Sequence, residues 1–191
     1  MTQDIKSMLR LGGVLCAFTL IVSLLLAGVN MLTAPVIAQN EINALNAALQ
    51  TVFPEAMEFP EVTVSDEDKA QKGIQNAYQA MDASGAVVGM AVQVAPSGFG
   101  GPINMIVGVR EDGTIVSAEI LSMAETPGLG TKAGDAKFID QFIDKGASLS
   151  VIKSGTPDNN QILAITGATV TSAAVTKGVN DAQAFAVQSM Q

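Results

Sequence analysis

The stretch Thr166-Gly167-Ala168-Thr169-Val170-Thr171-Ser172 lies between a short apolar run, residues 162–165, and a segment with apolar residues at helical spacing, residues 173–188. Four of its seven side chains carry a hydroxyl group. The pattern predicts a strand, a tight turn and then a helix. At a helix start, unpaired backbone N–H groups and the positive end of the helix dipole lie beside such hydroxyls. A phosphate can bind at a turn of this kind.

A simpler interpretation of the same turn is a capped helix. Either Thr166 or Thr169 would then be the N-cap residue, and a good cap contributes about 1 kcal/mol. The residues of the turn alone do not decide between a cap and a phosphate site.

Upstream of this turn, the apolar pattern changes to a strand-like alternation. Four strand-like segments are predicted, at residues 74–81, 87–94, 103–110 and 115–121, and the loops 82–85 and 111–113 have turn chemistry. A helix is predicted at residues 135–145, where Phe138, Ile139, Phe142 and Ile143 form an apolar stripe. Antiparallel hairpins with separate helices predict an α+β fold.

The amino-terminal part contains no charged residue from Leu11 to Asn40. At 1.5 Å per residue, residues 11–28 span about 27 Å, close to the thickness of the hydrocarbon core. We therefore expect a transmembrane helix at residues 10–32. The alternative is a cleaved signal peptide, but the apolar run is long and no small-residue cleavage site follows it.

The positive charges near this segment predict its orientation. Lys6 and Arg10 precede the span, and no Lys or Arg follows it before Lys69. By the positive-inside tendency, the amino terminus is cytoplasmic and the rest of the chain is extracytoplasmic. The expected localisation is a single-pass protein of the cell (inner or cytoplasmic) membrane.

The segment after the membrane span is predicted to contain one helix and one loop. Pro35 would mark a break or a first helical turn, residues 36–52 an amphipathic helix, and residues 55–73 a connecting loop with little regular structure. The predicted organisation is a cytoplasmic segment (1–9), a transmembrane helix (10–32), an amphipathic helix and linker (33–73), and one extracytoplasmic domain (74–191).

The composition excludes several classes of function. The chain has 18 Asp and Glu against 10 Lys and Arg, with one Tyr and no Trp, so nucleic acid is an unsuitable partner. It contains no His, which excludes His-based metal sites and His general bases. Its single cysteine, Cys16, cannot form an intramolecular disulfide or a CxxC pair. Any redox chemistry must therefore come from a bound cofactor.

Two further loops have unusual composition. The first is Ser97-Gly98-Phe99-Gly100-Gly101-Pro102, whose glycines permit positive φ and a close backbone approach to a ligand. The second is Glu125-Thr126-Pro127-Gly128-Leu129-Gly130-Thr131-Lys132, which combines a tight turn with a carboxylate, a hydroxyl and an ammonium group. Taken alone, either loop could be an ordinary surface connection.

Together the three loops resemble the motifs of the FMN-binding domain family. Thr166–Thr169 resembles its S/T-G-A-T motif, residues 98–103 its G-[FY]-G-G-P-I segment, and residues 125–130 its E-T-P-G-L-G motif. The motifs occur in the family order, and the anchor with the exit 30–35 is similar to the G subunit of Rnf electron-transport complexes. A His that some members carry two residues before the Glu is replaced by Met123.

The resemblance implies a covalent flavin cofactor. In the family, the last Thr of the motif carries FMN through a phosphoester bond, which implies Thr169, and a separate flavin transferase attaches it from FAD. Thr166, Thr171 and Ser172 are rival acceptors that spacing does not exclude. The implied cofactor-binding residues are Thr169, Thr166, Gly167, Ala168, Thr171, Gly98, Gly100, Gly101, Glu125, Thr126, Leu129, Gly130 and Lys132. Because positive charge near the ring tunes its potential, we hypothesise that Lys132 or nearby backbone N–H groups favour the anionic reduced or semiquinone flavin. No catalytic residue and no metal ligand is expected.

The implied function is an electron relay within an ion-translocating ferredoxin or NADH oxidoreductase, beside other membrane and iron–sulfur subunits. Such a relay has no organic substrate of its own. An alternative is a free-standing, membrane-anchored flavin reductase. A third is a tethered structural protein that uses the threonine turn only as a helix cap.

Overall fold

The structure is a computed structural model that describes residues 2–146 and 148–190, with side chains from residue 6 onward. Met1 and Gln191, at the outer ends of two predicted segments, lie outside the described residues. The chain divides into two compact units, Met1–Ala44 and Leu45–Gln191. Each unit is described by itself below.

The first unit belongs to a single long helix, α1 (Thr2–Val52), which continues without interruption through Pro35. All described side chains from residue 6 to residue 44 are exposed. The helix is long and apolar enough to cross a membrane. The predicted break at Pro35 was wrong, because proline has a helical φ and removes only one intrahelical hydrogen bond. The predicted amphipathic helix 36–52 is the end of α1.

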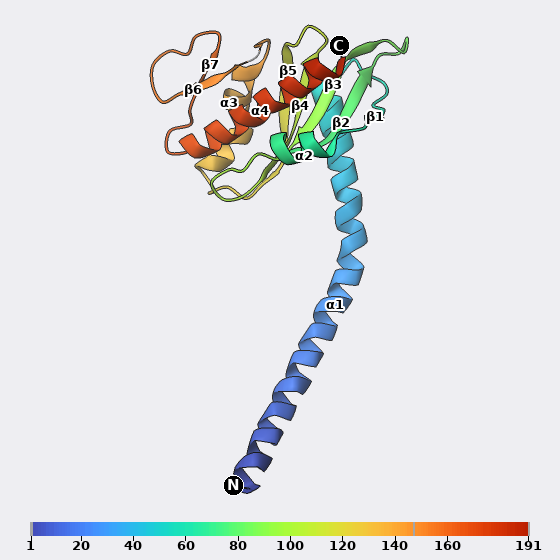
Figure 1. Cartoon of the computed structure of the whole chain (residues 1–191), viewed down its shortest axis with the longest axis vertical. Helices are drawn as coiled ribbons and strands as arrows, with labels where there is room; N and C mark the ends of the chain where they lie inside the picture. Colours follow the sequence, from blue (N-terminus) through green and yellow to red (C-terminus); the bar gives the residue numbers. More distant parts are fainter. Residues whose placement is uncertain (1, 147, 191) are drawn as a thin grey trace. The chain divides into compact units, whose positions relative to one another are not determined.

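The second unit contains a five-stranded antiparallel sheet in the order β1-β2-β3-β4-β5 (Figure 1). The strands are β1 (Glu61–Val62), β2 (Ile74–Met81), β3 (Val87–Val94), β4 (Ile103–Arg110) and β5 (Ile115–Met123). The predictions for β2, β3 and β4 are confirmed at both ends, and β5 extends two residues further. The α+β prediction is therefore confirmed.

The segment predicted as an irregular loop contains β1 and a short helix, α2 (Asp66–Lys72). Ser65 is the N-cap residue, since its hydroxyl accepts from Asp68 N–H at 3.1 Å, and Gly73 ends the helix at φ +66°. No residue of α2 is buried. Hydrophobic periodicity could not reveal this helix, because its end caps and charges stabilise it instead.

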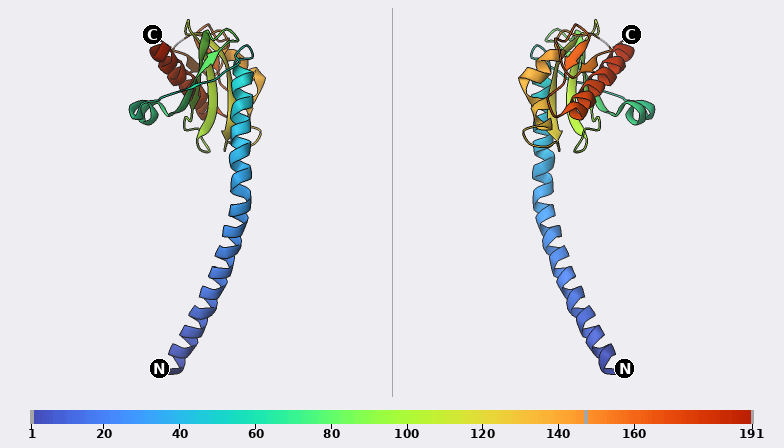
Figure 2. Two further views of the ribbon diagram at one scale, coloured as in Figure 1. Left: turned by 90° about the vertical axis from the view of Figure 1, so that its right-hand side faces the viewer. Right: turned by 90° about the vertical axis from the view of Figure 1, so that its left-hand side faces the viewer.

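The two faces of the sheet pack against different parts of the chain. Helix α4 (Thr169–Met190) packs against β3 and β4 on one side (Figure 2), where the core includes Met90, Val92, Met105 and Val107. On the other side, Ala91 and Ile106 form a second core with Val52 and Phe53. A Cβ at Gly89 would lie 2.7 Å from the Phe53 ring, so this face needs glycine there.

The predicted helix at residues 135–145 is only partly formed. The structure has η1 (Gly130–Gly134), α3 (Ala136–Ile139) and η2 (Asp140–Phe142), after which the chain turns at Asp144, which has a φ of +58°. Asp144 N–H donates to Ile115 O at 2.8 Å, and Ile115 N–H donates to Lys145 O at 2.9 Å. Pairing with the start of β5 thus replaces the last helical turn. Phe138, Ile139 and Phe142 are buried as predicted, whereas Ile143 is exposed.

The strand before the threonine turn is β7 (Gln161–Leu163), which pairs in parallel with β6 (Ser150–Ile152). The turn follows, and α4 begins at Thr169 rather than at the predicted residue 173. The predicted order of strand, turn and helix is confirmed, and the hydroxyl cluster therefore contains the first turn of α4.

Candidate functional site

The threonine turn, the glycine loop and the loop after β5 enclose one pocket of about 420 Å³. Small-molecule sites typically measure about 300–1,000 Å³. The pocket is lined by Phe99, Glu125, Thr126, Leu129, Gly130, Gly167, Ala168, Thr169, Val170 and Thr171. Three segments that are distant in sequence therefore line one pocket.

Thr169 is the first residue of α4 and is half-buried at this pocket. The first intrahelical bond of α4 runs from Ser172 N–H to Ala168 O at 3.0 Å. The N–H groups of residues 169–171 therefore have no partner within the helix, and the positive end of the dipole lies with them. Gly167, at φ +81°, supplies the left-handed backbone that turns the chain into the helix.

The four hydroxyl groups of the turn have different surroundings. Thr171 is buried and donates to Glu125 Oε2 at 2.9 Å. Ser172 is buried, accepts from Ile165 N–H at 3.0 Å and donates to Ala168 O at 2.9 Å. Thr166 is exposed and lines a different pocket. Thr169 combines a place in the main pocket with a hydroxyl that makes no hydrogen bond to the described part of the chain.

The cap interpretation is therefore wrong in its detail. Neither Thr166 nor Thr169 caps α4 through its side chain in the described residues. The first turn is instead stabilised from within by Ser172, whose hydroxyl joins the end of the β7 segment to the helix. The Thr169 hydroxyl is left available for chemistry.

Glu125 connects the three loops. Its side chain is 6% exposed, and its Oε1 accepts from Phe99 N–H at 2.8 Å and from Gly100 N–H at 3.1 Å. Its Oε2 accepts from the Thr171 hydroxyl. All three bonds are donated to the carboxylate, which is how an ionised carboxylate bonds. One buried side chain thus joins the glycine loop to the first turn of α4.

The glycines of these loops make room for Glu125. A Cβ at Gly98 would overlap Glu125 Oε1, and a Cβ at Gly100 would overlap the carbonyl oxygen of Ala124. A Cβ at Gly130 would lie 2.5 Å from Glu125 Oε2 and 3.0 Å from Thr171 Oγ1. Close packing around the carboxylate explains Gly98 and Gly130, and the Ala124 carbonyl group explains Gly100, in addition to any approach of a ligand.

Some predicted site residues lie away from the main pocket. Lys132 and Thr166 line a neighbouring pocket of about 270 Å³, together with Lys137 and Phe138. Gly98, Gly100 and Gly101 support the glycine loop without lining the main pocket.

Phe99 and Val170 also line the pocket, although the sequence motifs did not predict them as site residues. Phe99 is 74% exposed and Val170 is 55% exposed, and Leu129 joins them at 43%. An aromatic residue inside a glycine-rich loop has little chance of burial, and this signal could have identified Phe99. The three side chains form an apolar rim around a polar floor.

The residues fit FMN by their chemistry. The apolar rim suits a planar ring, and the amino end of α4 suits a phosphate. In the described part of the chain, no cluster of His, Cys, Asp or Glu could hold a metal ion. The site therefore offers an anion-binding turn and an apolar enclosure.

Comparisons with known proteins agree with this geometry. The chain matches an FMN-binding domain over residues 98–184 and an RnfG N-terminal region over residues 1–52. It is 36% identical to the G subunit of the Na(+)-translocating ferredoxin:NAD(+) oxidoreductase complex of Acetobacterium woodii, covering 93% of this chain and 90% of the relative. It is 37% identical to the G subunit of the proton-translocating ferredoxin:NAD(+) oxidoreductase complex of Clostridium ljungdahlii, covering 83% of this chain and 80% of the relative.

Solved structures show the fold. The crystal structure of Shewanella oneidensis NqrC matches 73% of this chain and 73% of its own, at a TM-score of 0.55 and 19% identity. The crystal structure of the C subunit of the Na(+)-translocating NADH-quinone reductase from Parabacteroides distasonis matches 80% of this chain and 95% of its own. Its TM-score is 0.50 and its sequence identity is 21%. The fold is thus NqrC-like, and the chain belongs to the RnfG family, the G subunits of Rnf-type ion-translocating oxidoreductase complexes.

Proposed function

We propose that this chain is a membrane-anchored electron carrier that holds FMN through a phosphoester bond to Thr169. It would serve within an ion-translocating oxidoreductase complex and would have no organic substrate of its own. Membership of the RnfG family and the match to an FMN-binding domain support the class of function. The complex would supply the electron donor and acceptor through its other membrane and iron–sulfur subunits.

One observation carries the assignment of the acceptor. Thr169 has the hydroxyl that lines the main pocket without a hydrogen bond to the described residues, whereas Thr171 and Ser172 are buried and bonded. A threonine hydroxyl is a weak nucleophile and needs activation. The chain contains no His to act as a base. This absence fits attachment by a separate flavin transferase.

The residues of the site would bind and orient the cofactor. The N–H groups at the start of α4 would hold the phosphodiester charge, with about 0.3–1 kcal/mol from the dipole at an exposed site. Phe99, Leu129 and Val170 would flank the ring. FMN, when bound, supplies reversible one-electron transfer. Lys132 would act on the ring potential from the neighbouring pocket.

The anchor would place this domain outside the cytoplasmic membrane. Lys6 and Arg10 precede the apolar part of α1, which supports a cytoplasmic amino terminus. A covalent bond would then have a clear purpose, because a loosely bound flavin outside the cell would be lost by dilution.

The proposal is tested by mass spectrometry of the denatured full chain, expressed in membranes with an active flavin transferase. We expect the tryptic peptide 154–177 to carry one FMN less water, located on Thr169. Thr169→Ala should abolish the adduct. Thr166→Ala is the matched control, since it removes an exposed hydroxyl from the same turn and should leave the adduct in place. An unmodified wild-type peptide, or an adduct that persists in Thr169→Ala, would overturn the assignment.

The free-standing reductase remains the second candidate. Its favourable observation is the exposed rim of Phe99, Leu129 and Val170, which leaves the pocket open to an external acceptor. A reductase would turn over when purified alone, whereas a relay would be inactive without its partner proteins. Steady-state reduction of soluble acceptors by the isolated flavoprotein distinguishes the two.

A further inference from the structure

The strongest unexplained feature is the burial of Glu125 at the floor of the main pocket. A buried carboxylate is costly unless its oxygens are hydrogen-bonded. Glu125 meets this cost with two backbone donors and one hydroxyl, at 2.8, 3.1 and 2.9 Å. Its partners, Phe99, Gly100 and Thr171, are 25 to 46 residues away in sequence.

The packing around Glu125 is specific to this side chain. Glycine at positions 98 and 130 leaves space that the carboxylate fills, and a Cβ at either position would collide with it. Gly130 also leaves the path open for Thr171, whose hydroxyl would lie 3.0 Å from a Cβ there. The arrangement thus depends on one carboxylate and on two glycines contributed by two loops.

This arrangement acts on Thr169 through the first turn of α4. The Thr169 hydroxyl makes no hydrogen bond to the described residues, so its direction follows the backbone of the turn. Ser172 ties that turn to nearby residues, at sequence separations of 7 and 4. Thr171 ties it to a loop 46 residues away. The bond to Glu125 therefore holds the start of α4 against the opposite wall of the pocket.

We propose that Glu125 is a positioning residue for the modification of Thr169. Its carboxylate fixes the glycine loop and the first turn of α4 to each other, and thereby presents the Thr169 hydroxyl at the pocket. This inference rests on the proposed function for the identity of the acceptor. It assigns Glu125 to the support of the site rather than to contact with the cofactor.

The first test measures the rate of modification. The full-length apoprotein is made without a flavin transferase, then mixed with the transferase and FAD, and the adduct is followed by mass spectrometry. Glu125→Ala removes all three bonds, and only the one from Thr171 reaches the first turn of α4. We therefore expect it to slow modification by about 10- to 100-fold, the range for loss of one hydrogen bond to a charged group. Glu125→Gln should recover much of the rate, since its amide oxygen can still accept from Phe99 and Gly100, and its amide N–H can donate to the Thr171 hydroxyl oxygen. Glu119→Ala, an exposed charge on β5, is the matched control and should keep the wild-type rate.

A double-mutant cycle tests the route through Thr171. Thr171→Val should slow modification in the wild type and have no further effect in Glu125→Ala, because the two side chains act through one bond. Additive effects in the cycle would overturn the proposed route.

Hydrogen exchange of the apoprotein supplies a readout that needs no flavin. Glu125→Ala should raise amide exchange in residues 98–100 and 172–175, whose N–H groups are hydrogen-bonded in the wild type, and should leave β3 and β4 protected, which separates loss of positioning from unfolding. Thr169→Ala should leave both segments unchanged. Unchanged exchange in Glu125→Ala, or wild-type labelling of that variant on Thr169, would overturn the inference. If FMN is never attached to the wild-type protein, the proposed function fails. The exchange result then decides by itself whether Glu125 holds the glycine loop and the first turn of α4 together.

Discussion

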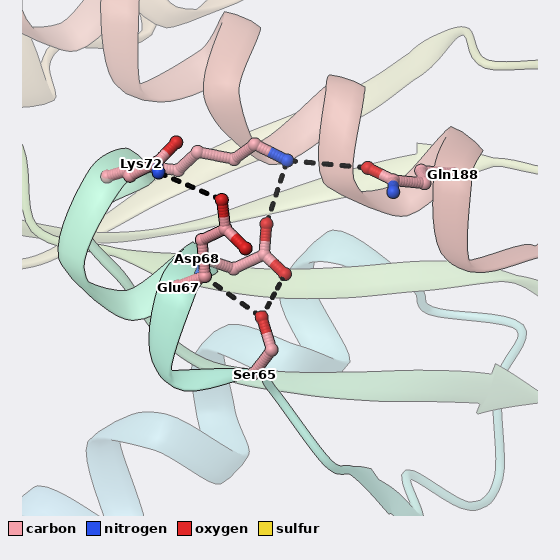
Figure 3. Close-up of polar contacts among 6 residues, drawn as sticks. Ser65, Glu67, Asp68, Lys72 and Gln188 are labelled. Carbon is pink, nitrogen blue, oxygen red and sulfur yellow. Dashed lines mark hydrogen bonds and ion pairs between the residues drawn. The ribbon is translucent and has the colours of Figure 1, made fainter.

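The two ends of α4 are attached to the domain by similar chemical groups in different surroundings. At the amino end, a carboxylate, a hydroxyl and backbone N–H groups meet in the buried cluster of Glu125, Thr171, Phe99 and Gly100. At the carboxyl end, Gln188 accepts from Lys72 at 3.5 Å, and Lys72 pairs with Asp68 at 2.8 Å (Figure 3). This second group lies on the surface beside α2.

Burial makes these two attachments unequal. Exposed ion pairs contribute about 0–1 kcal/mol, because water competes for both partners. A buried donor left without a partner costs about 1–3 kcal/mol, because nothing replaces the lost bond. Loss of the attachment at the amino end of α4 is therefore expected to destabilise the domain more than loss of the attachment at its carboxyl end.

The largest effect is expected where a backbone atom has no room to move. Gly100→Ala would place a Cβ against the carbonyl oxygen of Ala124, next to the Glu125 cluster. We expect the free energy of unfolding to fall by about 3 kcal/mol, the upper range for overpacking. Gly146→Ala is the control, since nothing lies within 4 Å of a Cβ there, and it should change stability by about 0.5 kcal/mol at most. Chemical denaturation measures both, and equal losses would contradict this account.

An intermediate effect is expected at the middle of α4. Gln183 is 3% exposed, and its amide donates to the carbonyl oxygen of Gly113 at 2.6 Å. Gln183→Met keeps the length of the side chain and removes the donor, which leaves that carbonyl without its partner. A loss of about 1–2 kcal/mol is expected in the same denaturation experiment. An unchanged free energy of unfolding would mean that a water molecule donates a hydrogen bond to the Gly113 carbonyl oxygen in the variant.

The smallest effect is expected at the exposed end, and it depends on pH. The hydrogen bonds from Lys72 and then Ser65 hold the pKa of Asp68 below its ordinary value. A carboxyl with a lowered folded pKa stabilises the protein above its unfolded pKa of about 3.9, and this stability is lost as the pH falls through the folded value. Asp68→Asn should therefore cost about 0.5 kcal/mol at pH 7, and the difference should disappear at lower pH. A larger cost at low pH than at pH 7 would contradict this sign.

The sequence was most informative where side-chain period and turn residues agree. The strands β2 to β4 are short runs rich in apolar residues that end at proline, glycine and aspartate, so their ends were predicted correctly. Residues 135–145 carry a helical stripe, but pairing with β5 overrides it at Asp144 and Lys145. Helix α2 depends on its caps rather than on an apolar face, and periodicity therefore missed it.

The site was predictable in its parts and not in their arrangement. The three motifs indicated which loops meet, and these loops do enclose one pocket. Nothing in the sequence indicated that Glu125 bonds to Thr171, because that pairing depends on how the sheet orients two distant loops. The same limit explains why Lys132 was predicted at the main pocket. It follows the loop that lines this pocket in sequence, but it lines the neighbouring pocket instead.

The sequence separations between Glu125 and its hydrogen-bond partners determine at which stage of folding the pocket can form. A short peptide containing residues 166–172 would include every hydroxyl of the turn, but neither Glu125 nor the Phe99 and Gly100 amides. The closing of loops of 25 to 46 residues carries an entropic cost that only the assembled sheet and α4 repay. The pocket is therefore a property of the finished domain, and a chain whose synthesis has reached residue 130 would contain two of its walls and lack the third.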